Sequence, residues 1–293
     1  MISNVFSHSF SVALRQWRIT AIVYFFQLFL ALTLGMQAFE VLKASIGHSL
    51  EINKLLAHYD HTVITDFLKV HGASITPLIG QLRWLLLVWL IFSVFIDAGL
   101  LYCASKGTGS EQATARTFWL GGAEYFFSFL KISLLFLVLA LVWTGVILLP
   151  IAIFMEPSLE YFATEQYTVW ATLFLLLIYL IGLALLFIGS VLSRVIKIKT
   201  GASIASCIKK GWQVFWKNKR GFMGLMSGFI GLQIVLVTVY WLLESVIGMT
   251  SPLGILVLFV AQQAFVYFRI QIRQMMYAGV GSLAIIAENK IQH

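Results

Sequence analysis

Asp97 is the only acidic residue that lies well inside an apolar stretch of this 293-residue chain. A carboxylate at membrane depth is costly, and such groups pair with another charge or face a water-filled cavity. Asp97 lies twelve residues before Gly109, and Arg269 lies twelve before Gly281. If the two glycines mark equivalent points of a repeat, Asp97 and Arg269 lie at the same depth. The sequence therefore predicts that they form an intramembrane polar pair, directly or through one polar group or water.

This pair has two interpretations. A structural ion pair would hold two helices in register, whereas a functional pair would relay protons or bind a substrate. For nucleophilic catalysis, Ser93 lies one helical turn before Asp97, but no histidine lies in an apolar stretch to act as a general base. We therefore favour the structural pair, and we predict no catalytic residue and no cofactor.

Histidines gather in the segment 39–82, which we predict to be an outer loop with short helices resting on the membrane surface. His58 and His61 are three residues apart, a spacing found in metal sites on helices. The same segment also contains His48, His71, Asp60 and Asp66. Because no cysteine or HExxH pattern accompanies them, we predict solvated side chains and no metal site.

The elements that must position these residues are membrane-spanning helices. The chain is 60% hydrophobic and 11% charged, whereas soluble domains average about 25% charged residues. A spanning helix needs about 20 mostly apolar residues and satisfies its backbone hydrogen bonds internally. Six stretches qualify: Ile19–Ala38, Trp84–Ala104, Ile132–Phe154, Val169–Ser193, Phe222–Leu243 and Leu253–Tyr277. The sequence predicts an all-α integral membrane protein with six transmembrane helices in a single membrane domain, 1–293.

The basic residues predict the orientation. If the N-terminus is cytoplasmic, sixteen of the 20 Lys and Arg residues lie inside, and only Lys43, Lys54, Lys69 and Arg83 lie outside. By the positive-inside rule, both termini are then cytoplasmic, and we predict a bacterial inner-membrane location. The net charge of +8 lies beside anionic lipid headgroups. We favour this over nucleic-acid binding, because the basic residues flank spans and form no separate domain.

Two similar stretches indicate an internal repeat. "TGSEQA" (108–113) and "TGASIA" (200–205) are ninety-two residues apart, and "AGVGSLA" (278–284) is a weaker third copy. Each follows a predicted span, and glycine suits a turn there. We predict repeat units of approximately 1–107, 108–199 and 200–293, each with an interfacial helix, an outward span, a returning span and a glycine turn. The six spans would then form three tandem hairpins.

The predicted interfacial helices are amphipathic. Near the N-terminus the apolar face contains Phe6, Phe10, Ala13 and Trp17, and in the third unit it contains Ile204, Ile208, Gly211, Trp212 and Phe215. An apolar stripe beside a basic face is typical of a helix that lies in the membrane interface. The predicted membrane contacts are Arg15, Trp17, Arg18, Lys209, Lys210, Trp212, Trp216 and Lys217.

Small and polar residues recur within the spans. Gly221, Gly224, Gly228 and Gly231 share one helical face, which predicts close packing against another helix of the chain in preference to a homodimer contact. The amides are Gln27, Gln233, Gln262 and Gln263. For these we favour hydrogen bonds between helices over the lining of a polar cavity.

The stretches "CIKKGWQVFWKNKRGFMGLM" (207–226) and "ATARTFWLGGAEYFFSFLKISLLFLV" (113–138) each join an amphipathic helix to a span. This layout resembles the membrane domain attached to some bacterial glycerophosphodiester phosphodiesterases, and related bacterial six-span families of unknown function. The resemblance covers almost the whole chain and leaves no length for the soluble phosphodiesterase barrel, so it transfers no catalytic residue. It implies an inner-membrane protein connected with lipid or envelope processes.

These observations predict a non-enzymatic multi-pass inner-membrane protein, an accessory, scaffold or lipid-interacting protein of the cell envelope. Its partners would be membrane lipids, with a protein partner or a second copy left open, and not nucleic acid. The alternative is a transporter or permease for a small or lipidic substrate that uses Asp97 and Arg269, because transporters are commonly built from repeats. A wet cavity at Asp97 would favour transport, and a closed pair would favour the scaffold.

Overall fold

The structure, a computed structural model, describes residues 2–46, 61–106, 114–161, 165–247 and 251–292. Nearly all of these residues are helical, and none of them forms a β-strand. The helices are α1 (Ile2–Arg15), α2 (Trp17–Ile46), α4 (His61–Lys106), α5 (Ala115–Tyr161), α6 (Glu165–Thr200), α7 (Ile204–Lys217), α8 (Lys219–Ile247) and α9 (Pro252–Gln292). The predicted all-α fold is confirmed.

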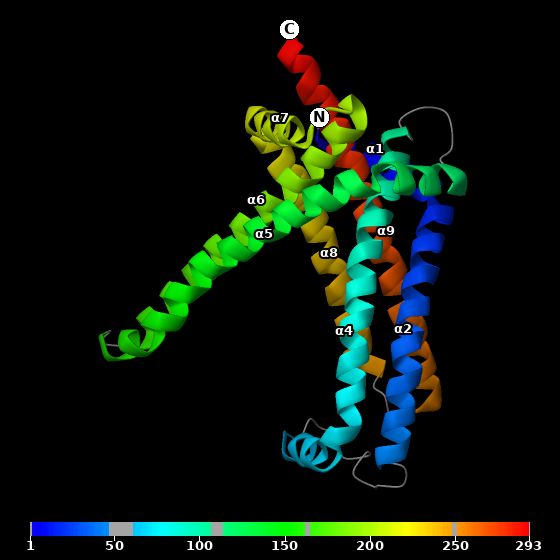
Figure 1. The fold of residues 1–293 in the computed structure, drawn as a ribbon, viewed down its shortest axis with the longest axis vertical. Helices are drawn as coiled ribbons and strands as arrows, with labels where there is room; N and C mark the ends of the chain where they lie inside the picture. The colour runs from blue at the N-terminus through cyan, green and yellow to red at the C-terminus, as the bar shows by residue number, and fades with distance from the viewer. Residues whose placement is uncertain (1, 47–60, 107–113, 162–164, 248–250, 293) are drawn as a thin grey trace.

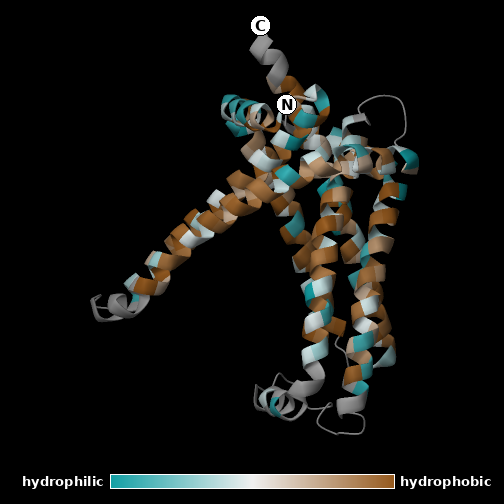
Figure 2. Ribbon diagram, viewed as in Figure 1, coloured by the Kyte–Doolittle hydropathy of each residue, from teal (hydrophilic) through white to brown (hydrophobic). Residues whose placement is uncertain are grey.

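Six of these helices are long and apolar enough to cross a membrane. The candidate spans are Trp17–Val41, Thr76–Ser105, Ala115–Ile153, Gln166–Thr200, Lys219–Ile247 and Pro252–Ala287. Each overlaps one predicted span, so the six-span prediction is confirmed. The spans expose large apolar side chains, with Leu141 63% and Trp170 68% exposed, and Figure 2 shows apolar residues along all of them. So much exposed apolar surface fits a lipid surround and not water.

The helices form an upright group and a diverging hairpin (Figure 1). In the upright group, α2, α4, α8 and α9 run side by side. In the hairpin, α5 and α6 pack against each other and lean away from that group. The two chain ends lie at the same end of the molecule, as an even number of spans requires. We call this end the terminal end.

The buried core lies at the terminal end. Its largest fully buried side chains include Phe118, Phe129, Ile132, Leu192, Phe222 and Leu283. The short helix α1 packs on α9 and α8, and α7 packs on α6. Some apolar residues of both short helices are buried, such as Val12 on α1 and Phe215 on α7, whereas Phe10, on the predicted apolar face of α1, is 47% exposed. Their apolar faces therefore contribute to the protein core as well as to any membrane contact.

The turn predicted at "TGASIA" is present. Helix α6 ends at Thr200, and Gly201 adopts φ +63°, a backbone conformation that favours glycine. The Lys197 ammonium donates hydrogen bonds to the carbonyl oxygens of Gly201 and Ala202, at 3.1 and 2.8 Å. The matching turn at "TGSEQA" (108–113) lies outside the described residues.

The turn predicted at "AGVGSLA" (278–284) is wrong, because α9 continues through it to Gln292. Tertiary packing keeps this segment helical. Val280, Leu283 and Ala284 are buried, and α1 packs along this helix. A Cβ atom on Gly279 would lie 3.0 Å from the side chains of Leu225 and Ser9, so this glycine permits close helix contact instead of a turn.

The glycine face predicted on α8 makes no close helix contact at Gly228 or Gly231. A Cβ atom on Gly231 would meet nothing within 4 Å, and one on Gly228 would meet only the Phe6 ring, at 3.7 Å. Gly221 is buried beside the Asn218 side chain, at the corner between α7 and α8. Gly224 is half-buried. The face of α8 that packs carries larger residues: Phe222, Leu225, Met226 and Phe229.

The close approach of helices occurs instead between α4 and α5. A Cβ atom on Gly99 would lie 2.8 Å from the backbone carbonyl oxygen of Phe118. We therefore expect Gly99→Ala to destabilise the fold by about 1–3 kcal/mol, because two backbones must separate. Gly231→Ala, with open space around it, is the control and should change stability little. Thermal unfolding of both variants in detergent, followed by tryptophan fluorescence, tests this. Equal unfolding temperatures would show that α4 and α5 are not in contact there.

Candidate functional site

Asp97 lies buried on α4 and is paired through both carboxylate oxygens. Its Oδ2 accepts a hydrogen bond from Nη1 of Arg194 at 3.1 Å. Its Oδ1 accepts hydrogen bonds from Nη2 of Arg273 and, at 2.6 Å, from the Tyr277 hydroxyl. Only 12% of the Asp97 side chain is exposed. The carboxylate is therefore closed off by three donors.

These donors come from different helices. Arg194 lies on α6, whereas Arg273 and Tyr277 lie one turn apart on α9, where Nε of Arg273 donates to the Tyr277 hydroxyl at 3.2 Å. Arg194 also donates from Nη2 to the Ser133 hydroxyl of α5, at 2.9 Å. The network thus joins α4, α5, α6 and α9. It crosses from the upright group to the diverging hairpin at their junction.

The prediction that Asp97 pairs with Arg269 is wrong, because Asp97 pairs with a different arginine of α9. Arg273, one helical turn further along α9, takes that place, and Arg269 makes no hydrogen bond or ion pair with any described residue. The prediction aligned α9 through Gly281 as a turn, but the helix continues through that residue. The alignment therefore misplaced the basic residue by one turn.

Arg194 was missed as a partner of Asp97. Its position near the end of a span led to its assignment to the cytoplasmic loop, although α6 continues to Thr200. The signal for it was a basic residue within "SVLSRVI" (190–196), a stretch that is otherwise uncharged. Such an arginine needs a partner when it is buried.

The arrangement favours the structural interpretation of Asp97. One carboxylate shared by two guanidinium groups leaves no free carboxylate oxygen for a proton relay. The Ser93 hydroxyl donates to the carbonyl oxygen of Leu90 at 2.8 Å, within its own helix. The Ser93 hydroxyl therefore donates its hydrogen bond within α4, and the Asp97 carboxylate is engaged in ion pairs.

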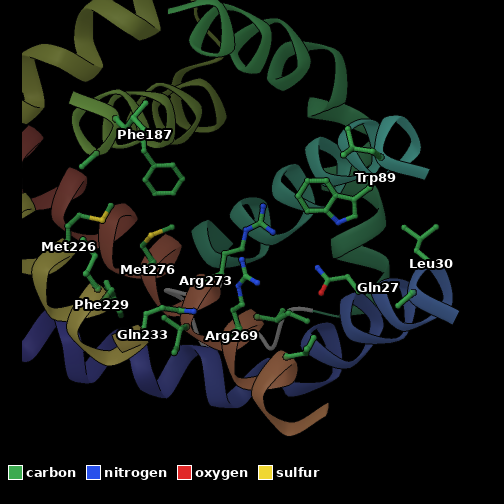
Figure 3. Close-up of a pocket in the computed structure, with 18 of the residues that line it drawn as sticks. Gln27, Leu30, Trp89, Phe187, Met226, Phe229, Gln233, Arg269, Arg273 and Met276 are labelled. Atoms are coloured by element: carbon green, nitrogen blue, oxygen red, sulfur yellow. The ribbon is translucent and has the colours of Figure 1, made fainter. Parts of the chain in front are cut away.

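A large cavity, broadly open to its surroundings, lies beside this network, between α2, α4, α6, α8 and α9 (Figure 3). Its volume is about 1020 Å³. Its apolar walls include Leu30, Trp89, Phe187, Met226, Phe229 and Met276. Its polar lining consists of Gln27, Gln233, Arg269 and Arg273, and none of its described lining residues is acidic. Figure 3 shows the guanidinium groups of Arg269 and Arg273 pointing into the space.

Three of the four glutamines divide between the two predicted roles, and the fourth is exposed. Gln263 accepts a hydrogen bond from the Tyr24 hydroxyl at 2.8 Å and so joins α2 to α9. Gln27 and Gln233 line the cavity instead, and Gln262 is exposed. The predicted hydrogen bond between helices is therefore present for Gln263. Gln27 and Gln233 instead line a cavity, which was the other predicted role.

The predicted membrane contacts are mostly on the surface at the terminal end. Seven of them are exposed: Arg15, Trp17, Arg18, Lys209, Lys210, Trp216 and Lys217. The Arg18 guanidinium lies 5.6 Å from the centroid of the Trp17 ring. Trp212 is different, because it is half-buried and its ring lies 3.2 Å from a Cβ position on Gly189 of α6. Trp212 therefore packs α7 onto the protein.

The histidine segment is only partly described. His48, His58 and Asp60 lie outside the described residues, while His61, Asp66 and His71 belong to α4. The described residues contain no group of three or more His, Cys, Asp or Glu side chains placed to hold a metal. The absence of a metal site remains a prediction.

The network makes a prediction for stability. Asp97→Asn leaves two guanidinium groups without their counterion, so we expect a loss of about 3 kcal/mol, near the lower end for buried pairs because the Arg273 side chain is 30% exposed. Arg269→Gln, the control, should change stability by less than about 0.5 kcal/mol. A double-mutant cycle should couple Asp97 to Arg273 and not to Arg269. Coupling of Asp97 to Arg269 and not to Arg273 would contradict the network and support the pair predicted from the sequence.

The comparisons with known proteins assign no family. No family model matches the chain, and no curated protein or solved structure matches it. The resemblance to the membrane domain of glycerophosphodiester phosphodiesterases therefore stays a prediction.

Proposed function

We propose that this chain is a non-enzymatic inner-membrane protein that holds a membrane lipid in the cavity between its spans. The observation that carries this proposal is the cavity of about 1020 Å³ among membrane-spanning helices. Pockets for drug-sized ligands are about 300–1,000 Å³, so this cavity is slightly larger than the upper end of that range. Its apolar walls suit acyl chains, and its few polar groups suit a headgroup.

The position of the cavity gives a lipid a lateral route into it. One wall belongs to α6 of the diverging hairpin, and the others belong to the upright group. All five helices that line it contain candidate spans, so its surroundings are bilayer. A space of this size lined by apolar side chains is filled by lipid at lower cost than by water.

The network at Asp97 favours binding over transport through an Asp97 site. The carboxylate is held by three donors, and moving a proton or substrate through it would break a buried ion pair. The spans are also continuous helices, whereas transporters typically place broken helices at their binding sites. Binding a lipid in an accessory role requires neither a broken ion pair at Asp97 nor a broken helix.

Lipid retention tests the proposal. Protein extracted gently and measured by native mass spectrometry should carry about one lipid. Ala184→Trp, which places an indole in the cavity wall, should reduce that occupancy severalfold. Ala264→Trp is the matched control, because Ala264 is exposed and does not line the cavity. Wild-type protein that retains no lipid, or equal retention in the two variants, would overturn the proposal.

We also place both termini in the cytoplasm, from the sixteen-to-four distribution of basic residues. A C-terminal green fluorescent protein fusion should therefore fluoresce, and a C-terminal alkaline phosphatase fusion should be inactive. The control is a phosphatase fusion after Met36, near the far end of the first span, which should be active. The reverse pattern would show the opposite membrane orientation, with both termini and the basic helix α7 outside the cytoplasm.

A further inference from the structure

Arg269 lines the cavity and is a cation with no partner among the residues that the structure describes. It makes no hydrogen bond or ion pair with any described residue, although it lies within the span Pro252–Ala287. The Arg269 side chain is exposed where it lines the cavity, so its charge is accessible to an anion from the bilayer, and such an anion would stabilise a charge that faces apolar walls. Figure 3 shows its guanidinium group beside that of Arg273, pointing into the cavity.

The described residues supply no anion for Arg269. The described residues that line the cavity include two arginines and no acidic side chain. The nearby carboxylate, Asp97, is already shared by Arg194 and Arg273. This network therefore has one more positive than negative charge, and Arg269 adds a second unbalanced positive charge.

We propose that Arg269 binds the phosphate of an anionic membrane lipid, of the phosphatidylglycerol type, whose acyl chains lie along the apolar walls. This inference rests on the proposed lipid-binding function and names the lipid class. A guanidinium group matches a phosphate with paired N–H donors. The Gln27 and Gln233 amides, which line the same cavity, supply further hydrogen bonds to the headgroup.

The charge of the cavity selects the headgroup. A zwitterionic lipid, such as phosphatidylethanolamine, carries an ammonium group that needs an acceptor with negative charge. The described cavity lining offers none, so this ammonium would stand among cations. An anionic headgroup without an ammonium group meets only favourable charges.

The depth of Arg269 agrees with a lipid headgroup. Arg269 lies roughly 17 residues beyond Pro252 along α9, or about 26 Å at 1.5 Å per residue. The hydrocarbon core is about 30 Å thick. With the proposed orientation, Arg269 therefore lies near the cytoplasmic edge of the core, within reach of phosphates of the inner leaflet. A free phosphate ion would leave the apolar walls empty, whereas a lipid fills both parts.

The experiment measures lipid selection in nanodiscs that contain equal amounts of phosphatidylglycerol and phosphatidylethanolamine. Lipid that stays bound to the released protein is identified by native mass spectrometry. Wild-type protein should enrich phosphatidylglycerol about five- to tenfold over the nanodisc ratio, as expected for one ionic contact. Arg269→Gln should lower this enrichment to near one, while total bound lipid stays close to that of the wild type.

Three further variants make the result specific. Arg116→Gln removes an exposed arginine that does not line the cavity, and it should keep the enrichment. Arg269→Lys keeps the charge and should keep most of it. Gln233→Glu adds a carboxylate to the cavity lining and should abolish the enrichment by repulsion, which provides a second test if Arg269→Gln does not fold.

The outcomes separate this inference from the proposed function. If wild-type protein retains lipid without preferring phosphatidylglycerol, or if Arg269→Gln and Gln233→Glu keep the preference, the anionic-lipid assignment is wrong and lipid binding stands. If wild-type protein retains neither lipid, the proposed function fails and the assignment fails with it. Displacement of the bound lipid by inorganic phosphate alone would show a free-anion site and would also overturn the assignment.

Discussion

The ion pairs of Asp97 belong to a network that joins four helices of the described structure through one buried carboxylate. One carboxylate on α4 holds an arginine on α6 and another on α9, and Arg194 extends the network to Ser133 on α5. A buried ion pair contributes little net stability compared with apolar packing, but removing one partner is expensive. The network therefore contributes to the specificity of helix packing more than to net stability. It sets which helices meet where the α5–α6 hairpin leaves the upright group.

The position of the core explains why a cavity exists. Buried side chains gather at the terminal end, where the amphipathic helices α1 and α7 pack over the spans. Away from that end, the hairpin and the upright group separate. In water such a separation would expose apolar surface at high cost, but lipid solvates apolar helices, so no hydrophobic force closes the gap. The same weak constraint that lets the helices diverge leaves room for a ligand of the bilayer.

Two arginines one turn apart on α9 have different environments, and this difference connects structure with function. Arg273 is held by Asp97 and Tyr277, while Arg269 has no partner among the described residues. The first carries out the structural role that the sequence suggested for Asp97 and its partner. The second lines an apolar cavity with an unbalanced charge, and we propose that it is a binding group. In this proposal the structural and the functional role, which the sequence left as alternatives for one pair, belong to two different arginines.

By itself, the sequence determined the class of the protein and its spans, because lipid requires long apolar helices that satisfy their own backbone. It also showed that Asp97 needs a partner, because the cost of a buried charge depends on residue type and depth alone. Only the tertiary structure decided which arginine pairs with it, since one turn of α9 separates Arg269 from Arg273. It likewise decided that the segment 278–284 stays helical and that Gly228 and Gly231 of α8 make no close contact. Helix rotation and the packing of distant segments such as α1 set these outcomes, and neither is encoded in local periodicity.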